Sequence, residues 1–114
     1  MVVRSKAMLD GAREQPCVNC GVSDGTVVAA HYTGMRAHWM GKGTAHKVSD
    51  LFVADLCQRC HSQFDLHTKE PRTDSKDDFA KKIDLSEQFL FLVVKTLSRR
   101  VDQKIISVKG YISL

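Results

Sequence analysis

The sequence lacks any apolar run long enough to cross a membrane, and its N-terminal stretch lacks the apolar segment of a secretory signal peptide. We therefore expect no membrane partner and a cytoplasmic location. Proline and tryptophan are scarce, with two and one respectively, and no internal repeat or low-complexity segment is present. The 114 residues are the size of a single domain. Such a chain buries about 65% of its unfolded surface, which is enough for a modest core.

Cysteine is limited to four residues, which form two Cys-x-x-Cys pairs: Cys17 with Cys20, and Cys57 with Cys60. Thiols stay reduced in the cytoplasm, so pairs at this spacing favour a metal site over disulfides. Gly21 follows the first pair, and glycine permits the positive φ that the tight turn of a zinc knuckle needs. The sequence therefore predicts a structural, tetrahedral zinc site with four thiolate ligands. A redox role for the two pairs is the alternative.

Positive charge exceeds negative charge by four, and the sequence pI is about 9.0. This balance permits nucleic-acid binding without establishing it. Segment 33–49 combines basic residues with the single tryptophan, a combination suited to phosphates and to a base or sugar. The predicted contact residues are Arg36, Trp39, Lys42 and Lys47. Alternatively, Trp39 only packs this loop against the domain.

Local patterns predict a small α+β fold. Short β-branched and apolar segments at 26–32 and 50–56 are typical of strands, and a helix would then open at the second cysteine pair. Residues 4–14 suit a short helix or an ordered arm. Apolar residues spaced by three and four predict a long C-terminal helix over about 76–103. A knuckle, two strands and a helix in this order make a treble clef, whose zinc-bound core would span about residues 15–67.

The predicted C-terminal helix is apolar around more than one face between Phe89 and Val94. Either this helix is buried on most sides or it supplies a homodimer interface. Arg99 and Arg100 follow near its end, where we expect both to be available to phosphate. Asp55, inside the second predicted strand, is expected to pair with a basic neighbour rather than with a metal.

Two histidines and two aspartates suggest metal-dependent hydrolysis. His31 ends the first predicted strand, and His61 and Asp65 stand at i and i+4 of the predicted helix, on one face. Phosphodiester hydrolysis needs a metal at the phosphate and a neutral imidazole that takes a proton from the attacking water. Asp50 is the best candidate to orient that imidazole. Alternatively, His31 is a structural histidine, His61 a helix-surface residue and Asp65 a solvated acid.

The motifs combine into one pattern: Cys17-x-x-Cys20, Ala30-His31, Asp50 and Cys57-x-x-Cys60-His61-x-x-x-Asp65. This pattern resembles the HNH (ββα-metal) endonucleases that carry a four-cysteine zinc, and among them small prophage nucleases of the YbcO type. The resemblance covers roughly residues 4–67. It implies that His31 is the general base and that His61 and Asp65 bind a catalytic divalent ion. That ion would be Mg²⁺ or Mn²⁺, with Ni²⁺ or Zn²⁺ as alternatives.

Three positions depart from the wider HNH pattern. Ala30 stands where many members have an aspartate or histidine as a third ligand, and His67 or a water would have to replace it. Asp50 replaces the middle asparagine, and Asp65 replaces the last histidine. The resemblance implies a DNA endonuclease or nickase that serves prophage DNA processing or recombination. The alternative is a non-catalytic, zinc-stabilised module that binds DNA or another protein.

Overall fold

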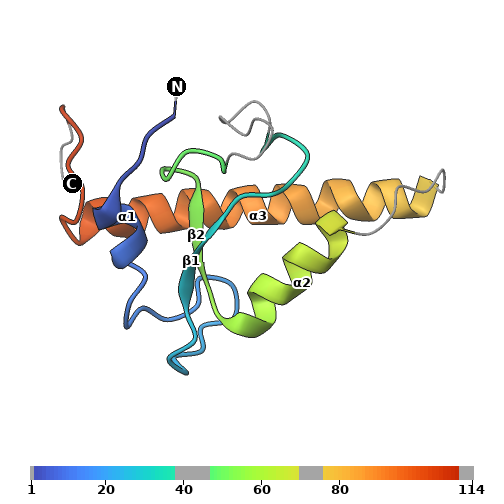
Figure 1. Cartoon of the computed structure of the whole chain (residues 1–114), viewed down its shortest axis with the longest axis horizontal. Helices are drawn as coiled ribbons and strands as arrows, with labels where there is room; N and C mark the ends of the chain where they lie inside the picture. Colours follow the sequence, from blue (N-terminus) through green and yellow to red (C-terminus); the bar gives the residue numbers. More distant parts are fainter. Residues whose placement is uncertain (1, 38–46, 70–75, 111–114) are drawn as a thin grey trace.

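The computed structural model describes residues 2–37, 47–69 and 76–110, except for the side chains of 66–69. Its elements are α1 (Lys6–Asp10), β1 (Val28–His31), β2 (Val53–Leu56), α2 (Gln58–Lys69) and α3 (Lys76–Asp102). Figure 1 shows that α3 runs along the whole molecule, that both strands cross its C-terminal half, and that α2 slants toward its N-terminal end. The α+β class and the order of knuckle, strand pair and helix are therefore as the sequence predicts. None of the helices within the described ranges is long and apolar enough to cross a membrane.

The two strands pair antiparallel, with Val28 opposite Leu56 and His31 opposite Val53. Both are shorter than the sequence predicts because polar contacts turn the chain at their ends. Before β1, the Asp24 carboxylate accepts hydrogen bonds from the backbone N–H and the hydroxyl of Thr26, at 3.0 and 2.6 Å. Before β2, residues 49–52 form a turn rather than a strand. Strand β1 nevertheless ends at His31, as predicted.

Aromatic packing joins β1 and α2 to α3. The rings of Tyr32 and Phe89 meet edge to face with centroids 5.4 Å apart, and those of Phe64 and Phe89 are 4.8 Å apart. Edge-to-face and tilted pairs of this kind add about 1 kcal/mol each to the stabilisation from buried area. Phe89 thus anchors α3 against both the strand that ends at His31 and the helix that carries His61.

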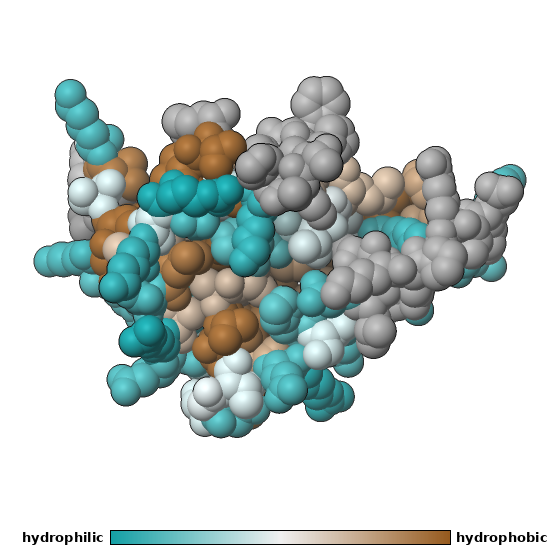
Figure 2. Space-filling model, in the orientation of Figure 1, coloured by the Kyte–Doolittle hydropathy of each residue, from teal (hydrophilic) through white to brown (hydrophobic). Residues whose placement is uncertain are grey.

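The long helix α3 is buried along one face only. Phe89, Leu92 and Val93 lie in the core, whereas Phe91 and Val94 are 56% and 55% exposed. In Figure 2, apolar residues form small groups among hydrophilic side chains over the strands. A homodimer through the exposed apolar residues of α3 stays a prediction.

The centre of the fold is an ion pair. Asp55 and Arg100 are both fully buried, and the Arg100 guanidinium bonds both carboxylate oxygens, with an Nη1–Oδ2 distance of 2.7 Å. The predicted pairing of Asp55 with a basic neighbour is confirmed. The expectation that Arg100 is available to phosphate is wrong, because α3 turns this arginine inward against β2. Arg99 also bonds Asp55 Oδ2, at 3.1 Å, and stays 22% exposed.

Candidate functional site

The four cysteines converge on one point. Their Sγ atoms all lie within 4.8 Å of one another, and the Cys20 and Cys57 sulfurs are 3.7 Å apart. In a tetrahedral zinc site the Zn–S distance of about 2.3 Å puts sulfurs roughly 3.8 Å apart. The cluster is therefore close to the size that zinc requires, and the predicted metal site is confirmed at the level of its donor atoms.

Local backbone structure explains why these sulfurs meet. Gly21 has a φ of +82° and donates its N–H to the carbonyl of Cys17 at 2.8 Å, which closes the knuckle turn. A Cβ at Gly21 would meet no neighbour within 4 Å, so backbone conformation rather than space favours glycine there. The second pair lies at the start of α2, where the N–H of His61 bonds the carbonyl of Cys57 at 2.9 Å.

The pKa values and the crowding of the four thiols explain why this cluster needs a bound cation. Burial raises the pKa of Cys60 to about 12; the neighbouring sulfurs add to this rise, and a hydrogen bond from Asn19 Nδ2, at 3.3 Å, opposes it. For Cys17, burial also acts upward, but backbone N–H groups outweigh it and bring the pKa to about 7. Four thiolates so close together would repel one another without a positive charge between them. Soft, crowded thiolates are the donor set that zinc selects.

His31 and Asp50 form a hydrogen-bonded pair. The His31 Nε2–Asp50 Oδ1 distance is 2.8 Å, and the two side chains are 16% and 5% exposed. Burial acts to raise the pKa of Asp50, but hydrogen bonds from His31, Ser5 and Arg4 outweigh it and hold that pKa below its usual range. An ionised Asp50 accepts only, so Nε2 carries the proton and a neutral ring keeps its lone pair on Nδ1.

The N-terminal arm, residues 3–5, fixes Asp50 in place. The N–H of Ser5 donates to Asp50 Oδ2 at 2.7 Å, and the N–H of Asp50 donates to the carbonyl of Val3 at 2.7 Å. Arg4 Nη1 reaches Asp50 Oδ1 at 3.3 Å and the carbonyl of Val48 at 2.7 Å. The sequence does not predict these contacts between the arm and Asp50. The bonded residues are about 45 positions apart, and no local pattern indicates such a contact.

His61 and Asp65 form a second pair on α2. The distance between His61 Nε2 and Asp65 Oδ2 is 3.4 Å, and the side chains are 36% and 32% exposed. The predicted i, i+4 geometry is therefore present, on a surface open to solvent. Among the described residues, no third histidine, cysteine or carboxylate joins this pair in a metal-binding cluster. The side chain of His67 lies outside the described part.

The predicted DNA contacts divide into two groups. Arg36 and Lys47 are exposed at the two edges of segment 38–46. Trp39 and Lys42 lie outside the described residues.

Comparison of the chain with models of protein families, with curated proteins and with solved structures finds no match in any of the three. Its own residues therefore define it as an α+β chain with a four-cysteine metal-binding cluster and two histidine–aspartate pairs.

Proposed function

We propose that the protein is a metal-dependent endonuclease or nickase that hydrolyses DNA phosphodiester bonds. The pair formed by His31 and Asp50 carries this proposal. A general base must be neutral, must be oriented, and must present a lone pair to water. The hydrogen bond to Asp50 fixes the ring of His31 through Nε2 and leaves Nδ1 for the attacking water.

Asp50 would also stabilise the charge that forms on His31 during the reaction. When His31 takes the proton, the ring becomes an imidazolium, and the adjacent carboxylate stabilises that charge. Because the arm holds Asp50 through two backbone contacts and Arg4, the carboxylate needs no rearrangement as the charge forms. Burying an ionised carboxylate costs free energy of folding. Because Asp50 is buried against the histidine that ends β1, we infer a chemical role for it rather than a structural one.

His61 and Asp65 would hold the catalytic ion. One imidazole and one carboxylate suit Mn²⁺ or Mg²⁺, and the partial exposure of both side chains leaves room for a phosphate. When bound, such an ion neutralises charge on the phosphate and on the leaving 3′ oxygen. The resemblance to HNH endonucleases supports the same assignment. The zinc held by the cysteines is structural in this proposal.

One observation favours a second candidate function. Ala30 offers no ligand, and the described residues form no cluster of three or more histidines, cysteines or carboxylates around His61 and Asp65. Two ligands within the described residues would hold a catalytic ion weakly, which favours a zinc-stabilised module that binds DNA or a protein without cutting it. Cleavage by the purified protein separates the two candidates.

We expect zinc-loaded protein to nick supercoiled plasmid when Mn²⁺ or Mg²⁺ is added, and to be inactive when neither ion is added. Asp65→Ala should slow nicking on the order of 100-fold, since it removes one of two proposed ligands. The control is Asp84→Ala, which removes an exposed acid from α3 and should leave the rate unchanged. Zinc content is measured in every sample. Wild-type protein that binds DNA and retains zinc, yet never cuts, would support the binding module instead.

A further inference from the structure

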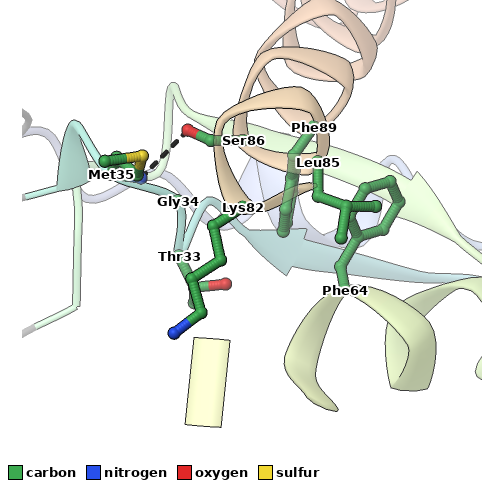
Figure 3. Close-up of a pocket in the computed structure, with 8 residues that line it drawn as sticks. All are labelled: Thr33, Gly34, Met35, Phe64, Lys82, Leu85, Ser86 and Phe89. Carbon is green, nitrogen blue, oxygen red and sulfur yellow. Dashed lines mark hydrogen bonds between the residues drawn. The ribbon is translucent and has the colours of Figure 1, made fainter. Parts of the chain in front are cut away.

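Helix α3 has two apolar faces, and only one of them is buried. Leu85, Phe89 and Leu92 pack against the core, and Figure 3 shows Leu85 and Phe89 pointing toward Phe64 of α2. The second face is a row of apolar residues three, four or seven positions apart, a spacing that places them on one side of a helix. This apolar stripe consists of Phe79, Ile83, Leu90, Val94, Leu97 and Val101.

Much of the apolar stripe is open to solvent. Phe79, Ile83 and Val94 are 53%, 44% and 55% exposed. Met35 and Val108 are also exposed and extend the apolar surface from neighbouring segments. Met35 lines a groove over the first half of the stripe, and Val108 lines a groove over its second half. A continuous apolar surface of this kind marks a site of protein–protein contact.

The length of the apolar stripe matches that of a stable interface. From Phe79 to Val101 the helix rises about 33 Å, at 1.5 Å per residue. A standard interface buries about 800 Å² on each partner, which corresponds to a patch about 30 Å across. The stripe and its two grooves are therefore long enough to support a dimer.

The spacing of the apolar stripe is symmetric about its middle. Leu90 and Val94 lie two positions on either side of Leu92, and Ile83 and Val101 lie nine positions on either side. In a two-fold dimer, residue i contacts residue j of the copy and j contacts i. If two α3 helices pair antiparallel about this point, Leu90 meets Val94 of the second copy. Ile83 likewise meets Val101, so the stripe is complementary to itself.

Local charge does not oppose such a pairing. The whole chain carries a net charge of +4, which by itself would repel a second copy. The groove over the first half of the stripe is lined by Arg36 and Glu87, and the groove over the second half by Asp102 and Lys109. Each half thus carries one base and one acid. Antiparallel pairing brings these two halves together without an excess of either sign.

We propose that the protein forms a two-fold homodimer in which the apolar stripes of two α3 helices pack against each other in antiparallel orientation. The second copy covers the exposed apolar side chains and both grooves. This interface uses none of the four cysteines and neither histidine–aspartate pair. The dimer is therefore independent of the proposed function, and a module that binds DNA without cutting it would form the same dimer.

Sedimentation velocity of the zinc-loaded protein across a dilution series measures the association. We expect a particle of twice the 12.8 kDa chain mass that dissociates on dilution. Val94→Glu places a charge beside the two-fold axis and should raise the dissociation constant at least about 100-fold. Because Val94 is exposed, this variant should retain its zinc and its helical circular dichroism. Gln88→Glu adds the same charge at an exposed position of α3 outside the stripe and should leave the dimer unchanged.

A mixing experiment tests the antiparallel orientation. Leu90→Lys protein and Val94→Glu protein should each be largely monomeric alone. In an antiparallel pair the introduced lysine of one chain meets the introduced glutamate of the other, so an equimolar mixture should form a heterodimer. A parallel pair would bring each introduced charge against an apolar residue, and mixing would then restore nothing.

Three results would overturn the proposal. Wild-type protein that stays monomeric at every concentration would exclude the dimer. A dimer that survives Val94→Glu would have its interface elsewhere on the molecule. A mixture of the two folded variants that does not associate would exclude the antiparallel orientation.

Discussion

Removal of zinc is expected to abolish the cooperative unfolding of this protein. The cysteine cluster joins the knuckle before β1 to the start of α2, and no disulfide replaces it. Binding at structural zinc sites contributes about 10–16 kcal/mol in zinc-finger peptides, as much as the whole net stability of a typical domain, about 5–15 kcal/mol. Chelation at pH 7 under reducing conditions should therefore eliminate the thermal transition seen by circular dichroism. Added zinc should restore it.

Cys60→Ser provides the matched genetic test. This substitution removes one buried ligand and should lower both zinc content and melting temperature, whereas Ser62→Ala, two residues along the same helix, should change neither. A metal-free wild-type protein that melts at the same temperature as the zinc-loaded form would contradict the structural role. It would also reopen the redox interpretation of the two Cys-x-x-Cys pairs.

The second large effect is expected at the buried ion pair. Arg100→Met should destabilise the zinc-loaded protein by about 3–5 kcal/mol, because it leaves the Asp55 carboxylate without its main partner in the core. Arg100 also donates from Nε to the carbonyl of Met8 at 3.1 Å, so the loss loosens α1 as well. Urea denaturation with zinc present would measure the free energy of unfolding.

The neighbouring arginine supplies the control. Arg99 contacts the same carboxylate but is partly exposed, and Arg99→Met should cost about 1 kcal/mol. The double variant Asp55→Leu with Arg100→Met should be less destabilised than Arg100→Met alone, since no unpaired charge remains in the core. Equal costs for the two arginine substitutions would show that burial of the pair is not what stabilises α3 against β2.

Sequence reasoning succeeded where the signal was local. The spacing of the four cysteines predicted one cluster because the first pair sits on a turn marked by Gly21 and the second sits at the start of a helix. Apolar periodicity predicted the long helix over about 76–103, and α3 spans Lys76–Asp102. The placement of His61 and Asp65 on one helix face follows from helix geometry alone. The catalytic roles of these residues stay predictions.

Contacts distant in sequence were the ones missed. The inward orientation of Arg100 depends on how α3 packs across β2. An arginine near the end of a helix is normally expected at the surface. The arm that holds Asp50 comes from residues about 45 positions away. The buried hydroxyl of Thr33, which has no hydrogen-bond partner, is likewise visible only in the folded chain. Each of these features arises from tertiary packing, which composition and periodicity do not predict.

The nicking rate of His31→Ala tests the central claim most directly. The assay uses supercoiled plasmid and Mn²⁺, with zinc content and melting temperature measured on the same sample. If His31 is the general base, the rate should fall by about 100-fold or more, with zinc retained and the fold intact. A rate within about threefold of the wild-type value, in protein free of contaminating nuclease, would contradict the assignment and remove the main support for a hydrolytic site.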